Sequence, residues 1–309
     1  MNESTATPDL DNMLNKRMIS LLSGLVKNEG YTESRLPGVY FMHSTEYVPP
    51  TPITYQPCIV VIVQGKKTGR IGDRRVLYDP DHYLVLAVPL PFECETLGSP
   101  EEPVLGVSVQ VSSSLVAELL LDLDAAPHDR RAALPQAMDS TPLDDAMRGT
   151  VLRLLESLTS ETDARIIGPA IIRELVYRVL QGPLGYNLRT LALPHSHEGR
   201  IGKILNRIHM NYADEFDVNE LAREAGMAVS TFHNHFKSVA RISPIQYIKS
   251  IRLHKARLKM VNEAMTASEA ALEVGYESTS QFSREYKRFF GATPAADAEL
   301  LREQLIHLI

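Results

Sequence analysis

The sequence lacks several features that define common classes of protein. It contains no run of about 18 or more apolar residues, which excludes a transmembrane helix of ordinary length. The first thirty residues contain no apolar segment of the kind that a signal peptide carries, so we expect no signal peptide. Only two cysteines occur, Cys58 and Cys94, and two cannot build a disulfide framework. We therefore expect a protein of the reducing cytoplasm.

Motifs of enzyme chemistry are also missing. The sequence contains no Gly-rich phosphate loop, no nucleophile elbow and no CxxC pattern of a zinc site. A cupin-type metal enzyme is the alternative interpretation of residues 37–111, but it requires clustered ligands such as two histidines and a carboxylate. His43 and His82 are far apart in the sequence, and His195 and His197 form an H-x-H pair without a third ligand. We expect no enzymatic activity, no cofactor and no metal.

The bulk composition is that of an ordinary soluble protein, but the charge is unevenly distributed. The 309 residues are 44% hydrophobic, enough for two domains with cores of their own. Residues 1–194 carry 17 Lys and Arg against 24 Asp and Glu, whereas residues 195–309 carry 15 against 14. The segment 230–260 contains no acid and seven bases, namely Lys237, Arg241, Lys249, Arg252, Lys255, Arg257 and Lys259. This asymmetry favours an anionic partner for that segment alone, and the alternative is a solvated helix face.

The first two thirds of the chain change pattern twice. Residues 1–9 are polar and expected to be disordered, and apolar residues at helical spacing predict an amphipathic helix over about 10–28. Short β-branched runs with Gly and Pro turns between them then predict a sandwich or barrel over 37–111, with strands at 58–64, 83–90 and 104–111. After Ser112 the pattern becomes helical. Two apolar faces, within 151–158 and 167–179, predict an antiparallel helix pair that ends at Gly182-Pro183.

The same small unit occurs twice in the last third of the chain. The stretch STFHNHFKSVARISP at 230–244 is echoed by SQFSREYKRFFGATP at 280–294, and Phe232 and Phe236 match Phe282 and Tyr286. Each stretch follows a short helical segment that ends in a glycine, at 226 or 275, where a tight turn needs positive φ. A long basic helical run, 245–263, joins the two units. The sequence therefore predicts two helix-turn-helix motifs on one connecting helix.

The duplication points to duplex DNA. A major groove admits one α-helix, whose outward polar side chains reach base edges while packed aromatics hold its angle. A connecting helix of about 20 residues spans about 30 Å, close to the roughly 34 Å between successive major grooves on one face of DNA. We expect phosphate contacts from four basic residues, Lys237, Lys249, Arg252 and Lys287. A helical adaptor that binds only protein is the alternative.

The C-terminal third resembles the AraC/XylS family of bacterial transcription regulators. The segment EVGYESTSQFSREYKRFFGATP is similar to that family's signature, and the resemblance covers about residues 198–300. It implies a seven-helix domain with two helices in adjacent major grooves. Matching positions imply base contacts from Ser230, His233, Asn234, Thr279, Ser280, Gln281, Ser283 and Arg284. Two positions depart from the family: Ala228 stands where a serine cap is common, and Asp297-Ala298 replaces the usual Tyr-Arg.

The N-terminal part resembles, more loosely, the sensor domains of one AraC subgroup. The stretch from Tyr55 to Thr96 follows their progression of strand, QGKK, turn, YLV and LP. The resemblance implies a cupin-like β-barrel with helices used for dimerisation, and promoter DNA, a small effector, a second copy of the chain and RNA polymerase as candidate partners. We name as an effector or redox site the residues Cys58, Cys94, Tyr55, Tyr83 and Phe92, with core packing as the alternative. Four nearby cations could activate a thiolate: Lys66, Lys67, Arg70 and Arg74.

The predicted fold class is α+β. A tail and helix at 1–29 precede a cupin-like β-barrel sensor at 30–185, which includes a helical dimerisation pair within 143–181. A linker at 186–199 leads to an all-α double helix-turn-helix domain at 200–309. The predicted function is sequence-specific, effector-controlled regulation of transcription.

Overall fold

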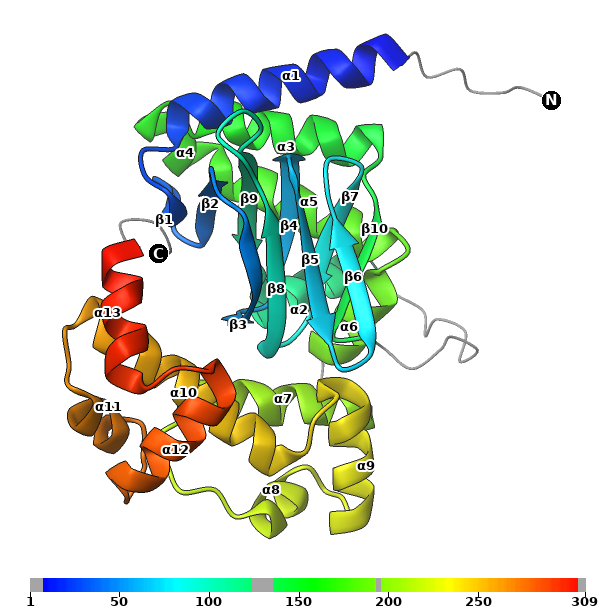
Figure 1. The fold of residues 1–309 in the computed structure, drawn as a ribbon. Coiled ribbons are helices and arrows are strands. Elements are labelled where there is room, and N and C mark those ends of the chain that lie inside the picture. The colour runs from blue at the N-terminus through cyan, green and yellow to red at the C-terminus, as the bar shows by residue number, and fades with distance from the viewer. Residues whose placement is uncertain (1–7, 124–135, 193–195, 305–309) are drawn as a thin grey trace.

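The structure, a computed structural model, describes residues 8–123, 136–192 and 196–304 of the chain. The disorder predicted for residues 1–9 falls outside the described residues, except at positions 8 and 9, which are helical. The histidine at position 195, considered for a metal site, also lies outside them. Helix α1 (Pro8–Leu25) lies across one end of the N-terminal domain (Figure 1) and confirms the predicted amphipathic helix. Its apolar face is anchored by Met18 and Leu22, which are fully buried. No helix in the described ranges is long and apolar enough to cross a membrane.

The N-terminal domain is built on two antiparallel sheets. The first has the strand order β1-β2-β9-β4-β7-β10 and the second β3-β8-β5-β6. The strands of the first sheet are β1 (Gly30–Glu33), β2 (Val39–Ser44), β4 (Cys58–Gln64), β7 (His82–Leu86), β9 (Val104–Gln110) and β10 (Met138–Pro142). Those of the second sheet are β3 (Val48–Tyr55), β5 (Lys66–Ile71), β6 (Arg74–Tyr78) and β8 (Leu90–Leu97). Both sheets contribute buried side chains to one hydrophobic core, as the predicted β-rich sensor requires.

The predicted strands are correct in two cases and need correction in the third. β4 and β9 match the runs at 58–64 and 104–111 almost residue for residue. The run at 83–90 is two strands, because the chain leaves the first sheet after Leu86 and enters the second at Leu90. Pro89 lies in this crossing, where its missing N–H costs no ladder bond. β10 lies outside the predicted β region and pairs with β7.

Helices complete the N-terminal domain. They are α2 (Ser113–Asp122), α3 (Asp145–Ser157), α4 (Glu161–Ile166), α5 (Gly168–Gln181) and α6 (Gly185–Ala192). The predicted pair is α3 and α5, which contact each other and end as expected, with Gly182 at the C-cap of α5. Their apolar faces are buried within the chain itself, with Leu154 and Leu175 fully inaccessible. A dimer through these helices would therefore use their outer surfaces.

The predicted linker is mostly helical. α6 occupies its first part, and α7 begins at His197 with Ser196 as its cap. Seven helices follow in the described C-terminal residues: α7 (His197–Met210), α8 (Val218–Glu224), α9 (Val229–Ala240), α10 (Pro244–Asn262), α11 (Ala267–Glu273), α12 (Thr279–Phe290) and α13 (Pro294–Gln304). Their number is the one that the family resemblance implies. They pack below the sheets in Figure 1, with α10 running between the two helix-turn-helix units.

Candidate DNA-binding surface and effector cavity

The two helix-turn-helix units repeat the same local construction. In the first, Asp217 caps α8 by accepting the N–H of Asn219 at 3.0 Å, and Gly226 turns the chain with φ of 62°. In the second, Thr266 caps α11 with a capping box, and Gly275 turns with φ of 83°. A Cβ at Gly275 would lie 2.4 Å from the Ala213 carbonyl oxygen. Both this steric clash and the positive φ therefore disfavour any other residue at position 275.

Buried aromatic rings hold both outer helices. Phe232 and Phe236 of α9 are fully buried, with ring centroids 5.5 Å apart. Phe282 and Tyr286 of α12 are also fully buried, with centroids 5.4 Å apart. Because aromatic rings at matching positions are buried in both, the two outer helices pack on the rest of the domain through the same face, as the duplicated sequence predicted.

The opposite faces of α9 and α12 remain accessible. On α9 the side chains of Ser230, Asn234 and Lys237 are exposed, and His233 is half-buried. On α12 Thr279 is half-buried, and the exposed residues are Ser280, Gln281, Ser283, Arg284 and Lys287. The structure therefore leaves every residue that we predicted to contact bases at least partly open to a partner. None of them is covered by the core.

Two predicted phosphate contacts have other partners. Lys249 on α10 forms an ion pair with Glu285 at 2.7 Å. The guanidinium of Arg252 donates to three backbone carbonyls at 2.8–2.9 Å, those of Tyr212, Asp214 and Gly275. These bonds join α10 to the loop after α7 and to the second glycine turn. The geometry gives Arg252 a bracing role, whereas Lys237 and Lys287 have no acidic partner among the described residues.

The other cations of the acid-free segment are also engaged. Lys255 lies over the Tyr212 ring at 5.4 Å, and Lys259 contacts Glu263 and Glu273. Arg241 donates to the side chain of Gln136 in the N-terminal domain. Three of the seven bases, Lys249, Arg257 and Lys259, thus have acidic partners, so part of the positive charge of this segment is balanced within the chain.

A buried ionic network occupies the place where the chain departs from the family pattern. Asp297 of α13 accepts two bonds from Arg257, at 2.7 and 2.8 Å, and one from the Tyr286 hydroxyl at 2.6 Å. Arg257 also lies over the Phe290 ring, 4.4 Å from its centroid. Burial and the hydrogen bond to Asp297 raise the pKa of Tyr286 above its usual range. This network, which sequence reasoning missed, ties α10, α12 and α13 together.

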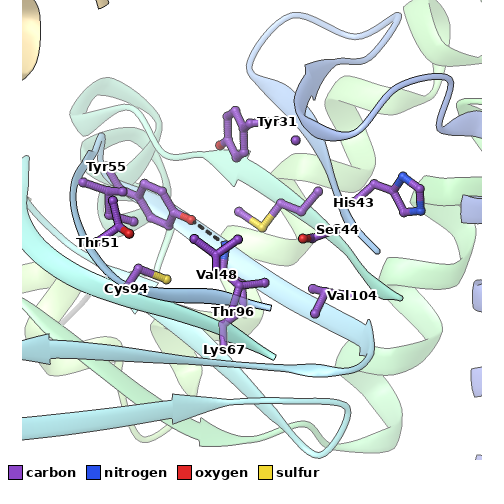
Figure 2. Close-up of a pocket in the computed structure, with 13 residues that line it drawn as sticks. Tyr31, His43, Ser44, Val48, Thr51, Tyr55, Lys67, Cys94, Thr96 and Val104 are labelled. Carbon is purple, nitrogen blue, oxygen red and sulfur yellow. Dashed lines mark hydrogen bonds between the residues drawn. The ribbon is translucent and has the colours of Figure 1, made fainter. Parts of the chain in front are cut away.

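A cavity of about 140 Å³ lies in the N-terminal domain (Figure 2). Its wall includes Tyr31, Tyr55, Lys67 and Cys94, from four different strands. The Lys67 ammonium donates to the Tyr55 hydroxyl at 3.3 Å. Among the described residues Lys67 has no acidic partner, which leaves one uncompensated cation in a largely apolar cavity. Burial raises the pKa of the Tyr55 hydroxyl, so this group is neutral beside the lysine.

The predicted effector residues are only partly brought together. Tyr55 and Cys94 line the cavity, and Phe92 meets the Tyr55 ring edge-on at 5.2 Å. Tyr83 is on β7 and does not line it, and neither does Cys58. Sequence reasoning missed Tyr31, because β1 carries no strong strand signal, and considered Lys67 only as a neighbour of a thiol.

The surroundings of Cys58 do not favour a thiolate. Burial raises the pKa of the Cys58 thiol to about 12. Cys94 is buried and lies 3.2 Å from the Tyr78 hydroxyl. Of the candidate cations, Arg70 is bound to Glu93 and Arg74 to Asp139. Cys58 therefore has the environment of a small buried hydrophobe, whereas Cys94 lines the same cavity as Lys67.

The two histidines considered for a metal site are separate. His43 contacts Glu29 at 3.3 Å, whereas His82 contacts Asp79 at 2.9 Å. In the part of the chain that the structure describes, no group of three or more His, Cys, Asp or Glu is placed to hold a metal ion.

Comparison with known proteins identifies both halves of the chain. A family model described as the N-terminus of AraC-type transcriptional regulators matches residues 35–187, and a helix-turn-helix domain model matches residues 221–299. The regulator ExsA of Pseudomonas aeruginosa is 30% identical over 161 residues, 52% of this chain and 55% of ExsA. The thermoregulatory protein LcrF of Yersinia pestis is 35% identical over 98 residues, 32% of this chain and 35% of LcrF. The chain thus spans about half or less of these relatives.

Solved structures show the same fold. An apo variant of ToxT from Vibrio cholerae is 11% identical with a TM-score of 0.59, covering 87% of this chain and 100% of that one. Wild-type ToxT described as bound to an unsaturated fatty acid gives a TM-score of 0.56 at 11% identity, covering 88% and 96%. The fold is shared over nearly the whole length, and the two family models account for the sensor part and the helix-turn-helix part. The chain belongs to the AraC/XylS family of transcription regulators.

Proposed function

We propose that the chain regulates transcription by binding specific DNA sequences through α9 and α12, under the control of a small effector in the N-terminal domain. The observation that carries this proposal is the duplicated unit, in which buried aromatic pairs present an open polar face on each outer helix. Such faces have no apolar surface to bury and are suited to base edges. As a transcription regulator, the protein works in the cytoplasm by binding, without catalysis.

The contacts divide between affinity and specificity. Lys237 and Lys287 supply phosphate contacts, which give most of the affinity and its salt dependence. His233, Asn234, Gln281 and Arg284 supply the sequence preference, together with the serines and the threonine beside them. Lys249 and Arg252 reach phosphate only if they leave the partners that they have in this structure.

The cavity of the N-terminal domain is the effector site in this proposal. Lys67 provides a cation without an acidic partner among the described residues, and the surrounding wall is mostly apolar. A small apolar molecule with an acidic group satisfies both features. The fatty acid described for ToxT, whose fold is similar, belongs to this chemical class.

The chain also forms a homodimer in this proposal, so that paired sites on DNA are used. The inner faces of α3 and α5 are occupied by the core, but α4 and α5 expose Ile166, Ile167 and Tyr177. Sedimentation at micromolar concentration tests this point. A dimer that Ile166→Asp dissociates supports these helices as the seam, and a monomeric parent chain contradicts it.

Binding of the purified chain to labelled duplex DNA at increasing salt tests the main proposal. We expect a steep loss of affinity with salt, and Lys237→Ala or Lys287→Ala should each reduce the slope by about 1. Lys203→Ala on α7 serves as a control at a cation outside the predicted contacts. Absence of DNA binding would favour an adaptor that binds only protein, and metal content measured on the same preparation tests the cupin enzyme alternative.

A further inference from the structure

An acidic side chain on the second outer helix has partners from three places in the fold. Glu285 is the one acid within Thr279–Phe290, the residues of α12. Its Oε1 accepts hydrogen bonds from Lys249 Nζ of α10 at 2.7 Å and from Gln281 Nε2 of α12 itself at 3.1 Å. Its Oε2 accepts a bond from the Tyr276 hydroxyl, in the turn between α11 and α12, at 2.9 Å. The carboxylate is therefore held in place from outside its own helix.

The same three bonds keep Glu285 ionised. Partial burial opposes ionisation, but the hydrogen bonds from Lys249, Gln281 and Tyr276 outweigh it, and the pKa of Glu285 lies below its ordinary value. Burial and the bond to Glu285 raise the pKa of the Tyr276 hydroxyl, so this group stays protonated and donates. The ion pair with Lys249 balances a negative charge that would otherwise repel the phosphates of a bound duplex.

The fixed carboxylate determines how the Gln281 amide is turned. A carboxylate accepts hydrogen bonds and cannot donate them, so Gln281 directs its NH2 group toward Glu285. The amide then offers a partner its carbonyl oxygen and its second N–H. In the major groove adenine presents a donor at N6 beside an acceptor at N7, whereas guanine presents two acceptors. The oriented amide matches adenine, whereas a freely rotating amide could turn both of its N–H groups toward guanine.

The first helix-turn-helix unit lacks this arrangement. The positions that match Gln281 and Glu285, at the offset of 50 residues between the two units, are Thr231 and His235. His235 contacts Glu198 of α7 at 3.1 Å instead. An ordinary i, i+4 pair on a helix surface is weak, and the bonds from α10 and from the turn distinguish Glu285 from such a pair.

We propose that Glu285 is a positioning residue for base recognition, which orients the Gln281 amide so that α12 prefers adenine to guanine at one base pair. The proposal rests on the function proposed above, in which Gln281 contacts a base, and adds a specificity determinant that does not itself touch DNA. Lys249 and Tyr276 act through Glu285, and they keep their bonds to it when DNA is bound.

Competition binding of the full chain to labelled duplexes tests the proposal. Selection from random duplex DNA with the parent chain supplies a bound duplex, and its single-base variants locate the base pair at which Gln281→Ala removes the preference. We expect the parent chain to prefer adenine to guanine there by about tenfold, and Glu285→Met, which keeps the length of the side chain and removes the acceptor, to reduce this preference to about threefold or less.

Further variants separate positioning from a structural role. In the Gln281→Ala background Glu285→Met should leave the base preferences unchanged, because Glu285 acts through Gln281. Glu277→Met, at an exposed acid just before α12, removes the same charge and should strengthen binding to all duplexes equally without changing any preference. If urea denaturation shows that Glu285→Met is unfolded, Tyr276→Phe removes one of the bonds that hold the carboxylate and should lower the adenine preference by about twofold.

The results that overturn the proposal are distinct from those that overturn the proposed function. Full adenine preference in Glu285→Met, or an equal change of preference by Glu285→Met in the Gln281→Ala background, would leave an ordinary surface pair or a structural residue. DNA binding in which Gln281→Ala affects no base pair also overturns this inference alone. A chain that binds no DNA overturns the proposed function and this inference together.

Discussion

Single residues in this molecule divide into those that face outward and those that brace the fold, and Arg252 shows the difference. Its guanidinium donates hydrogen bonds to three backbone carbonyls, and the substitution of Arg252 would remove all three bonds. We expect Arg252→Ala to lower the free energy of unfolding by about 2–4 kcal/mol, measured by urea denaturation.

The matched control for Arg252 is Lys287→Ala, at an exposed cation of α12. It should lower DNA affinity and leave the unfolding free energy within about 0.5 kcal/mol of the parent value. If Arg252→Ala instead weakened DNA binding without loss of stability, Arg252 would be a phosphate contact as the sequence suggested.

Arg284 should read a base. Its side chain is exposed on α12, and a bidentate contact to guanine is worth about 1–3 kcal/mol of discrimination. We expect Arg284→Ala to weaken specific binding by that amount and to relax preference at one base pair, measured on a set of single-base variants. Arg165→Ala, at an exposed arginine of α4, should change nothing. Uniform weakening on every sequence would make Arg284 a phosphate contact.

Outward-facing residues could be predicted from the sequence because helical periodicity fixes which side chains share a face. The partners of the cations on α10 could not. Lys249 and Glu285 are 36 positions apart, and Arg257 and Asp297 are 40 apart, so their pairing depends on tertiary packing. The effector cavity was difficult for the same reason, since Tyr31 and Lys67 meet only when two sheets face each other.

At the scale of elements, the two outer helices differ in their caps. Ser278 accepts the N–H of Gln281 at 3.2 Å and caps α12, whereas Ala228 at the start of α9 has extended backbone angles and no side chain that can cap. We expect Ala228→Ser to raise the free energy of unfolding by about 0.5–2 kcal/mol, and Ser278→Ala to lower it by a similar amount. Thermal and urea denaturation measure both.

The decisive result of that experiment is that the two substitutions change the free energy of unfolding in opposite directions. Ala228→Val, whose side chain cannot accept a hydrogen bond, is the control and should not reproduce the gain of serine. A destabilising Ala228→Ser would show that the loop before α9 cannot place a hydroxyl over the helix terminus.

Helix boundaries were predicted more closely than the sheets. α10 begins and ends within a residue of the predicted run at 245–263, because Ser243 and Pro244 mark its start. β10 was missed because a short segment with two prolines nearby joins the sheet only through pairing with β7, 52 positions earlier at Met138 and Leu86. The helix α6 within the predicted linker at 186–199 was not foreseen.

At the scale of the whole molecule, the two helix-turn-helix units are held differently. Buried residues of α7 to α9 belong to the same hydrophobic cluster as the sheets, whereas α11 to α13 form a separate cluster with the second half of α10. The Tyr247 hydroxyl donates to the Pro89 carbonyl at 2.8 Å and fixes α10 to the N-terminal domain. The first unit therefore packs continuously with the core of the N-terminal domain, whereas the second does not.

Two buried neutral histidines make the stability of the folded protein depend on pH. Burial lowers the pKa of His209, which contacts Gln56, to about 4, and that of His254 to about 3. Above about pH 6.5 these histidines are neutral in both the folded and the unfolded chain, so they do not change the free energy of unfolding. Below that pH they bind protons in the unfolded chain but not in the folded chain. Stability should fall as pH decreases from about 6.5 toward 4, with a slope of about 1.4 kcal/mol per unit for each histidine.

Urea denaturation from pH 7 to pH 4.5 measures this dependence. His209→Gln and His254→Phe should each flatten the curve, because each removes one titrating group from the contact. His82→Gln, at a partly exposed histidine bound to Asp79, is the control. A slope unchanged in all three variants would show that the buried histidines do not govern acid stability.

The central claim is that α9 and α12 of one chain enter successive major grooves, and selection of bound sequences from random duplex DNA tests it most directly. The account predicts that the site bound by each chain contains two preferred segments with centres about 10 base pairs apart, one erased by Asn234→Ala and the other by Arg284→Ala. Insertion of five base pairs between them should abolish the joint preference, because the segments then face opposite sides of the helix. A single segment, or two whose spacing has no effect on affinity, would contradict the account.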